Sequence, residues 1–248
     1  MLLDGKNAVI YGGGGTIGGA VARAFAAEGA HVFLAGRTLA SLEAVAEEIR
    51  AAGGIAETAE VDALDERAID AHADTVGAID ISFNLISHGD VQGTPMVEMA
   101  VDDYLRPVVN GVRTTFLTAR AAARSMIPRG SGVILLFGGS GDPPRGYYLG
   151  GLQTGFHALE AMRRQLASEL GEHGIRVVTL RTGGVPESIP ADFGPRDQIA
   201  DAITAATMLG RAATLADVGH AAVWAASDRA RSVTAATVNI SAGALIDD

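Results

Sequence analysis

The stretch VIYGGGGTIG, residues 9–18, decides how the rest of the chain is interpreted. It begins with the end of an apolar, strand-like run, and small residues in a helical pattern follow it. Within it, Gly13, Gly15 and Gly18 satisfy the spacing G-x-G-x-x-G. Glycines at this spacing let the backbone turn tightly and approach a pyrophosphate, which the N-terminus of the next helix stabilises. The stretch predicts a nucleotide-binding turn between a strand and a helix; the alternative is a glycine-rich turn that binds nothing.

Short β-type runs recur between longer helical patterns along the whole chain. The β-type runs are Asn7–Tyr11, His31–Ala35, Ile55–Val61, Asp80–Ile86, Val133–Phe137, Arg176–Leu180 and Thr237–Ile240. The helical patterns are residues 17–29, 38–54, Glu98–Met126 and Gly151–Leu170. Gly29 is placed as the C-terminal glycine of the first helix. The second helix has apolar residues at the i, i+3, i+4, i+7 spacing of one buried face, namely Leu42, Val45, Ala46 and Ile49.

Alternating strands and helices imply a parallel sheet with helices on both faces, joined by right-handed crossovers. The segments VILLF (133–137) and RVVTL (176–180) are nearly unbroken apolar runs, as strands covered on both faces should be. No Pro/Ser-rich linker, charge block or internal repeat divides the chain, so residues 1–248 are expected to form one domain. Ligands of such sheets bind outside the carboxyl ends of the strands, where the strand order switches.

The composition limits the class of function. The 248 residues carry a net charge of −10, which argues against nucleic acid or an anionic membrane surface as a partner. The absence of cysteine excludes disulfides and thiolate metal sites, and no His or acidic residues have zinc-ligand spacing. The N-terminus lacks a charged-then-apolar leader, and no apolar run approaches the ~20 residues of a membrane-spanning helix. We therefore expect a cytoplasmic protein that has a small-molecule substrate and no metal.

The end of the second strand bears on which cofactor the turn would bind. An NAD-type site expects an acidic residue about 20 positions on, which bonds the adenosine ribose hydroxyls. Here the strand ends AGRT, with Arg37 at that place and no carboxylate beside it. A guanidinium there would pair with a 2′-phosphate and stack on adenine, which favours NADP(H) over NAD(H). The alternative is a solvent-facing arginine.

Two further positions join this cofactor end. Thr38 follows Arg37 and is also well placed as the N-cap of the next helix. Asp62, in Val61-Asp62-Ala63 at the end of the third strand, would accept a hydrogen bond from the adenine amino group or cap the following helix. The cofactor-binding residues expected from these motifs are Gly12, Gly13, Gly15, Thr16, Ile17, Gly18, Arg37, Thr38, Asp62 and Ala63.

Together these motifs resemble the short-chain dehydrogenase/reductase family over essentially the full length of the chain. Asn84 in FNLIS sits where the family has Asn-Asn-Ala-Gly, and Asn110 in VVNGVRTTF matches the asparagine of its active-site helix. Thr182-Gly183 sits where a Pro-Gly follows the sixth strand. The stretches LGRAATLADVGHAAVWAASD and VTAATVNISAGAL are similar to the family's C-terminal helix, final strand and Asp-Gly-Gly ending. The resemblance implies a Rossmann fold with a seven-stranded, doubly wound parallel sheet, a homotetramer or homodimer, and cofactor contacts by Asn84 and Gly183.

The catalytic end departs from the family's pattern. A typical member uses a serine, an asparagine, a tyrosine that transfers the proton, and a lysine that lowers the pKa of that tyrosine. Aligning ASEL with the family's Ala-x-Glu-Leu puts Leu152 at the tyrosine, Phe156 at the lysine and Gly139 at the serine. Lys6, the only lysine, stands at the start of the first strand and cannot serve. Bringing a phenol from a pKa of ~10 to near 7 takes about 4 kcal/mol, which neutral residues do not easily supply. Of the four groups only Asn110 remains.

Three other residues are candidates for the proton transfer. Ser140 is adjacent to the expected serine position. The run HALEAM resembles the helix of the enoyl-reductase branch, whose tyrosine lies seven residues before its lysine, and that spacing falls one residue past Tyr148. Tyr148 is therefore a candidate donor, or else an aromatic wall of the pocket. His88 in ISHGD, with an unperturbed pKa of about 6.5, would suit general acid work without a lysine, or is merely solvated.

The segment 185–208, with three prolines and several acids, is expected to be a substrate lid; the alternative is a surface insertion without a role. The sequence predicts an NADP(H)-dependent oxidoreductase acting on a small carbonyl or an activated double bond. A second hypothesis is a catalytically silent NADP(H)-binding subunit that stabilises or regulates a partner. A non-redox enzyme in the manner of the halohydrin dehalogenases ranks last, because those keep a Ser, Tyr and Arg where this chain has none.

Overall fold

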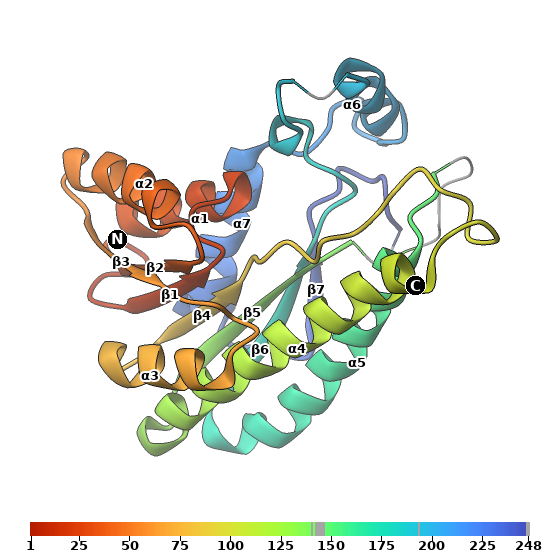
Figure 1. Cartoon of the computed structure of the whole chain (residues 1–248). Coiled ribbons are helices and arrows are strands. Elements are labelled where there is room, and N and C mark those ends of the chain that lie inside the picture. Colours follow the sequence, from red (N-terminus) through yellow and green to blue (C-terminus); the bar gives the residue numbers. More distant parts are fainter. Residues whose placement is uncertain (140, 142–146, 193, 247–248) are drawn as a thin grey trace.

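The apolar runs of the sequence form one sheet of parallel strands between two layers of helices (Figure 1). The computed structural model describes residues 1–139, 141, 147–192 and 194–246. The strands are β1 (Asn7–Tyr11), β2 (His31–Gly36), β3 (Ile55–Glu60), β4 (Ile81–Asn84), β5 (Gly132–Gly138), β6 (Ile175–Arg181) and β7 (Ala236–Asn239). Their order in the sheet is β3-β2-β1-β4-β5-β6-β7. The predicted seven-stranded, doubly wound Rossmann fold is therefore confirmed.

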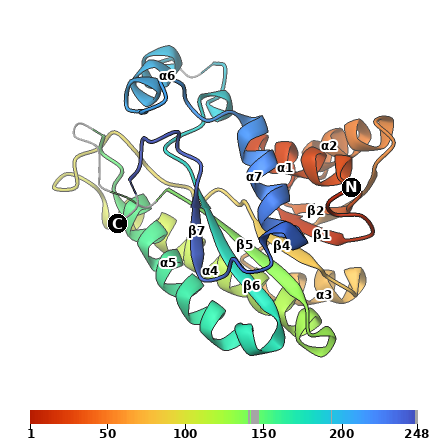
Figure 2. The same ribbon diagram turned by 180° about the vertical axis from the view of Figure 1, so that it is seen from behind.

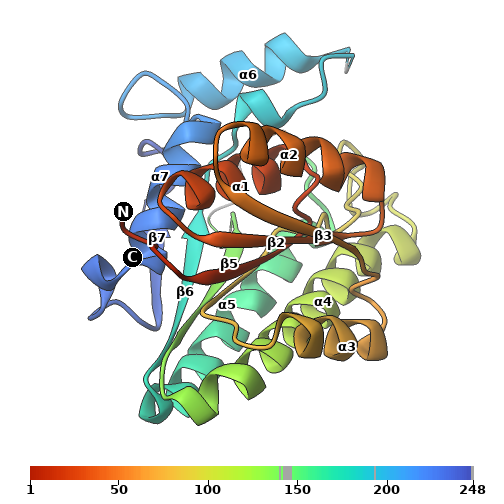
Figure 3. The same cartoon turned by 90° about the vertical axis from the view of Figure 1, so that its left-hand side faces the viewer.

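Helices cover both faces of the sheet, which Figure 3 shows nearly edge-on. The α-helices are α1 (Thr16–Ala27), α2 (Leu39–Ala51), α3 (Glu66–Val76), α4 (Val101–Met126), α5 (Gly151–Leu170), α6 (Arg196–Ala205) and α7 (Leu215–Ala226). On one face α1 packs against α2 and α7, and on the other α4 packs against α3 and α5. Buried apolar side chains fill each layer, around Phe25 and Leu34 on the first face and around Ile69 and Leu136 on the second.

Local sequence accounts for most of the element boundaries. Gly29 follows the end of α1 with φ +89°, a left-handed conformation that a C-terminal glycine adopts without a Cβ penalty. The predicted apolar stripe of α2 is buried against the sheet. The β4 strand is shorter than predicted because Asn84 Oδ1 accepts a hydrogen bond from the amide of Ile86 and turns the chain out of the ladder.

The sequence indicated helix α3 only as the helix after Asp62, without bounds. Asp65 caps it by accepting a hydrogen bond from the amide of Arg67 at 2.9 Å, and Ile69 and Ala73 form its buried side. Its inward residues Ile69, His72, Ala73 and Val76 have the i, i+3, i+4, i+7 spacing of one helix face, but one of the four is a histidine, so apolar residues alone do not bring out the pattern.

The predicted lid contains a short 3₁₀ turn at Pro186–Ser188 and the helix α6. Helix α6 has no buried residue among those described, and it stands away from the sheet when the protein is viewed from behind (Figure 2). Ile203 of α6 lies against Gly184, just after β6. Within the described part of the chain, no helix combines the length and apolar character needed to cross a membrane.

Candidate functional site

The glycine-rich turn lies at the carboxyl end of β1, in the middle of the sheet, where the strand order switches between β1 and β4. Gly12 has φ +82°, and a Cβ there would come within 2.5 Å of the carbonyl oxygen of Leu85, the residue after β4. A Cβ on Gly18 would come within 2.2 Å of the Gly12 carbonyl oxygen. These two glycines therefore hold the turn tightly against the neighbouring strand end and the first turn of α1.

The outer side of the same turn is open. Gly15 and Thr16 are exposed, and a Cβ on Gly15 would meet only the Gly12 carbonyl oxygen, at 3.4 Å. Within the described residues, the amides of Thr16 and Ile17 in the first turn of α1 have no hydrogen-bond acceptor. An exposed helix N-terminus with free amides attracts an anion, and a glycine there lets the anion approach. This part of the chain suits a pyrophosphate.

Arg37 is next to this turn, at the end of β2, and it is exposed. It forms no hydrogen bond or ion pair with another described residue. Thr38 occupies the predicted N-cap position of α2, but its hydroxyl does not cap the helix; the main-chain carbonyl of Thr38 accepts from Ser41 instead. Both side chains are therefore available to a ligand at the edge of the sheet.

Asp62 and Ala63 follow β3 as predicted. Asp62 is exposed, and its Oδ1 accepts from the amide of Leu64 at 2.9 Å, while Asp65 caps α3. Ala63 is buried in the helix layer on that side of the sheet. One carboxylate oxygen of Asp62 thus shapes the turn, and the other is free for a donor.

The side chain of Asn84 is engaged within the protein. Its Nδ2 lies 3.2, 3.3 and 3.4 Å from the hydroxyls of Thr114, Thr115 and Thr118 on α4, and its Oδ1 holds the turn after β4. Asn84 is buried. The amide therefore joins the end of β4 to α4, and any contact with a cofactor would fall to the main chain.

The centre of the predicted catalytic region is apolar. A Cβ on Gly139, at the end of β5, would lie 3.2 Å from Cε2 of Phe156 on α5, so the positions assigned to the family's serine and lysine are neighbours. The His88 ring lies against Phe156, with ring centroids 5.6 Å apart. Its Nδ1 is buried and has no hydrogen-bond partner in the described residues, and burial lowers its pKa although Asp90 opposes the shift. His88 is therefore a neutral imidazole at the core of this region.

The other predicted catalytic residues surround this centre. Nδ2 of Asn110, on α4, donates to the main-chain carbonyl of His88 at 3.2 Å and so positions the His88 loop. Tyr148 is 49% exposed, and its main-chain carbonyl accepts from Gly93. Ser140 lies outside the described residues. Gly183 follows β6, where a Cβ would come within 2.7 Å of Ala244.

The sequence analysis missed Gln153 at the start of α5. Its Nε2 donates to the carbonyl of Gly139 at 3.1 Å, and its Oε1 is buried without a partner among the described residues. Its position next to Leu152 in sequence was the available signal. Tyr11, which replaces the threonine of the family's glycine loop, is not part of the site: it is the last residue of β1, its buried ring forms a T-shaped pair with His72 of α3, and burial raises its pKa.

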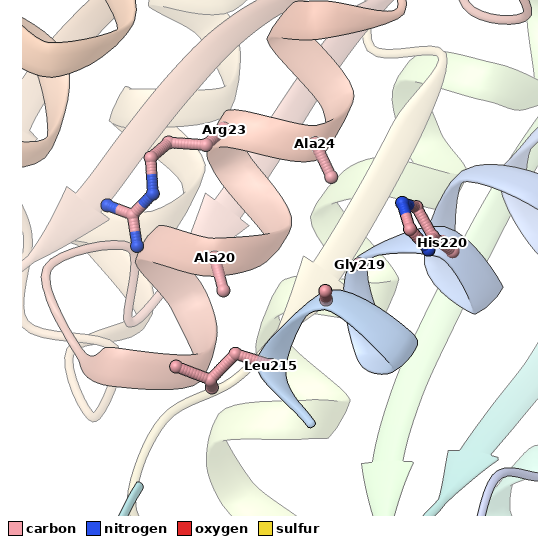
Figure 4. Close-up of a pocket in the computed structure, with 7 residues that line it drawn as sticks. Ala20, Arg23, Ala24, Leu215, Gly219 and His220 are labelled. Carbon is pink, nitrogen blue, oxygen red and sulfur yellow. The ribbon is translucent and has the colours of Figure 1, made fainter. Parts of the chain in front are cut away.

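A shallow hollow of about 300 Å³ lies elsewhere, between α1 and α7 (Figure 4). Small residues, among them Ala20, Ala24 and Gly219, line it because the two helices pack closely; a Cβ on Gly219 would lie 3.0 Å from the Cβ of Ala24. Arg23 at its rim pairs with Glu48. The hollow is a feature of helix packing on one face of the sheet.

No group of three potential metal ligands is present among the described residues.

Three comparisons agree with this geometry. A family model described as enoyl-(acyl carrier protein) reductase matches residues 14–244. Galactitol 2-dehydrogenase (L-tagatose-forming) of Cereibacter sphaeroides is 30% identical over 244 residues, which cover 97% of this chain and 95% of that relative.

Two solved structures share the fold over nearly their whole length. A short-chain dehydrogenase/reductase from Serratia marcescens superposes with a TM-score of 0.88 at 27% identity, covering 99% of this chain and 100% of the other. A structure named as an NAD(P)-dependent gluconate 5-dehydrogenase from Beutenbergia cavernae, with NADP bound at low occupancy, has a TM-score of 0.84 at 28% identity, covering 97% and 96%. This chain belongs to the short-chain dehydrogenase/reductase family.

Proposed function

We propose that this chain is an NADP(H)-dependent oxidoreductase that acts on a small carbonyl compound or an activated double bond. One observation carries the proposal: at the carboxyl edge of the sheet, the amides of Thr16 and Ile17 at the start of α1 and the neighbouring guanidinium of Arg37 all lack a partner in the part of the chain that the structure describes. The amides suit the pyrophosphate of a dinucleotide. The expected cofactor-binding residues, with Asn84 and Gly183 contributing main-chain contacts, remain predictions within this proposal.

Arg37 is the reason to prefer the phosphorylated cofactor. A guanidinium binds a phosphate through two parallel N–H donors, whereas a ribose with free hydroxyls needs an acceptor. No carboxylate adjoins Arg37 in the sequence. Among the solved relatives, the one from Beutenbergia cavernae has NADP bound and a 7α-hydroxysteroid dehydrogenase has NADH bound, so the preference rests on Arg37.

The reaction would need little from the protein beyond orientation and a proton. NADPH, when bound, supplies a hydride. Asn110 holds the main-chain carbonyl of His88, whose ring lies beside Phe156. Because burial lowers the pKa of this ring, we propose that the neutral imidazole donates an N–H hydrogen bond to the substrate oxygen rather than passing it a proton, which then comes from water or Tyr148. Tyr148 is half-exposed, and it would either form an aromatic wall of the substrate pocket or donate the proton to the substrate. A conjugated alkene can take its proton at carbon from water. Loss of the tyrosine–lysine pair should therefore slow the reduction of an alkene less than the reduction of a ketone.

One observation favours the second hypothesis, a catalytically silent NADP(H)-binding subunit. Phe156 fills the position aligned with the family's lysine, and Gly139 stands at the serine position. Lys6 lies at the opposite, amino edge of the sheet, beside Asp80 and Arg176. On this hypothesis the region would be filled by apolar side chains and would have no group for proton transfer.

Steady-state oxidation of NADPH with a panel of small carbonyl compounds and enones distinguishes the two hypotheses. The oxidoreductase proposal expects turnover with at least one of them, at least tenfold lower in His88→Ala because loss of one positioned hydrogen-bond donor to a developing oxyanion typically costs about 10²–10³-fold. Tyr148→Phe tests the second donor in the same way. Calorimetric NADPH binding without any turnover, unchanged by either variant, would favour the silent subunit.

We extend the proposal to a closing lid at residues 185–208 and to a homodimer or homotetramer in the cytoplasm. The lid is supported by the exposure of α6 along its described residues. Exposed apolar side chains along α4, at Leu105, Val109 and Phe116, would suit contact between copies. Light scattering of the purified protein measures the oligomeric state.

A further inference from the structure

The side-chain amide of Gln153 has a fixed orientation at the start of α5. One end of it lies 3.1 Å from the carbonyl oxygen of Gly139. A carbonyl oxygen only accepts hydrogen bonds, so the end that faces Gly139 is the –NH₂ group. The oxygen, Oε1, therefore points elsewhere. It is buried and has no hydrogen-bond partner in the described part of the chain.

This oxygen belongs to the same region as His88. Gln153 precedes Phe156 by three residues and so shares its side of α5. A Cβ on Gly139, which Gln153 binds, would lie 3.2 Å from Cε2 of Phe156, and the Phe156 ring also lies against the His88 ring. Nδ1 of His88 is a second buried polar atom without a described partner. Two buried polar atoms without a described partner thus belong to residues beside Phe156, one on the same side of α5 and one in contact with its ring.

A buried polar atom without a partner is costly, so each one calls for an explanation, such as a water, an ion or a catalytic role, and beside a substrate region a bound ligand can supply the partner. Oε1 of Gln153 can only accept, so the group that satisfies it must carry a hydrogen on oxygen or nitrogen. A ketone, an ester or an alkene alone has no such hydrogen. The substrate must therefore carry a donor in addition to the group that is reduced.

We propose that Gln153 determines specificity: its Oε1 accepts a hydrogen bond from an O–H or N–H group that the substrate carries close to its reacting carbonyl. The inference rests on the proposed function, because it takes the reacting group to be a carbonyl in this region. Substrates would then be hydroxy or amido carbonyl compounds. Simple ketones of the same size would be poor substrates.

The test compares compounds that differ only in the donor. One pair is hydroxyacetone and 2-butanone, which has a methyl group in place of the hydroxyl; the other is acetoacetamide and methyl acetoacetate. The wild-type protein should prefer the donor-bearing member of at least one pair in kcat/KM by about tenfold or more, because a site built to bond a donor rejects analogues that lack it. The pair that shows the preference distinguishes O–H from N–H.

The matched variants are Gln153→Met, which keeps the length but removes the acceptor, and Gln165→Met, the same change at an exposed position of the same helix. In Gln153→Met the preference should fall to about twofold or less, through loss with the donor-bearing compound alone, while NADPH affinity stays unchanged. Gln165→Met should keep the wild-type preference. A wild-type protein indifferent to the donor in both pairs would overturn the proposal, and so would a preference that Gln153→Met retains.

Binding separates this proposal from the proposed function. Dissociation constants of the same compounds for the NADPH-loaded protein, measured by ligand-observed NMR, do not depend on turnover. If no compound is reduced but the donor-bearing members bind more tightly to the wild type than to Gln153→Met, the oxidoreductase proposal fails and the role of Gln153 stands. If compounds are reduced without any such difference in binding or rate, only the role of Gln153 fails.

Discussion

Replacing Gly15 by alanine should weaken NADPH binding while the protein stays folded. Gly15 is the exposed N-cap of α1, with φ −80° and ψ 166°, a conformation that alanine adopts without strain. The new methyl group would meet the protein only at the Gly12 carbonyl oxygen, 3.4 Å away, which is ordinary contact. Since alanine is a poorer N-cap than glycine, we expect a loss of only about 0.5 kcal/mol in the free energy of unfolding.

The effect on binding should be much larger. The methyl group would stand over the first turn of α1, where the amides of Thr16 and Ile17 have no acceptor in the described residues. A hydrogen bond to a charged group contributes about 1.5–3 kcal/mol. Losing one of them corresponds to a tenfold to hundredfold higher Kd, since about 1.4 kcal/mol is a factor of ten.

Calorimetric titration with NADPH and urea unfolding measure the two quantities on the same preparations. Gly171→Ala is the matched control, because Gly171 has φ −61° and a Cβ there would meet nothing within 4 Å. Gly18→Ala gives the contrast: its Cβ would lie 2.2 Å from the Gly12 carbonyl oxygen, so stability and affinity should both fall. A folded Gly15→Ala protein that binds NADPH as tightly as the wild type would refute the placement of the pyrophosphate.

Three further predictions concern stability. Asn84→Ala removes the amide that joins β4 to three buried threonines on α4, and urea unfolding should show a loss of about 1–3 kcal/mol. Thr214→Ala breaks the capping box of α7, in which Thr214 accepts from the amide of Asp217 at 3.1 Å, and should cost about 0.5–2 kcal/mol in the same assay. Burial holds the pKa of His88 below its ordinary 6.5, so the unfolded chain takes up the proton first as the pH falls. The free energy of unfolding should therefore decrease below about pH 6.5 and level off below the folded pKa, and His88→Gln should reduce this decrease; an unchanged pH profile in that variant would contradict the burial of the ring.

Much of the fold follows from local sequence. Each β-type run became a strand: the central ones, such as β5, are nearly all buried, whereas the edge strands β3 and β7 are only partly buried. The bounds of helix α3 were not predicted, because its buried face includes His72 beside Ile69 and Ala73, and because Asp65, its cap, resembled any acidic loop residue.

The site was less predictable because its contacts join distant segments. Asn84 matched a family motif, but its side-chain partners are threonines of α4, which lie 30 to 34 residues later in the sequence. The burial of His88 depends on Phe156, which a local pattern around ISHGD does not contain. Gln153 owes its orientation to a carbonyl at the end of β5, and only the packing of α5 beside that strand brings the two together.

Calorimetry of NADPH and NADH with the wild-type protein and Arg37→Ala tests the central claim most directly, with Arg164→Ala, an exposed arginine on α5, as the control. The wild type and the control should bind NADPH about tenfold to hundredfold more tightly than NADH. This ratio corresponds to the free energy of one charge-assisted hydrogen bond between Arg37 and the 2′-phosphate. Arg37→Ala should bind the two cofactors equally. A wild-type protein that binds neither cofactor, or that binds NADPH no better than NADH, would contradict the account.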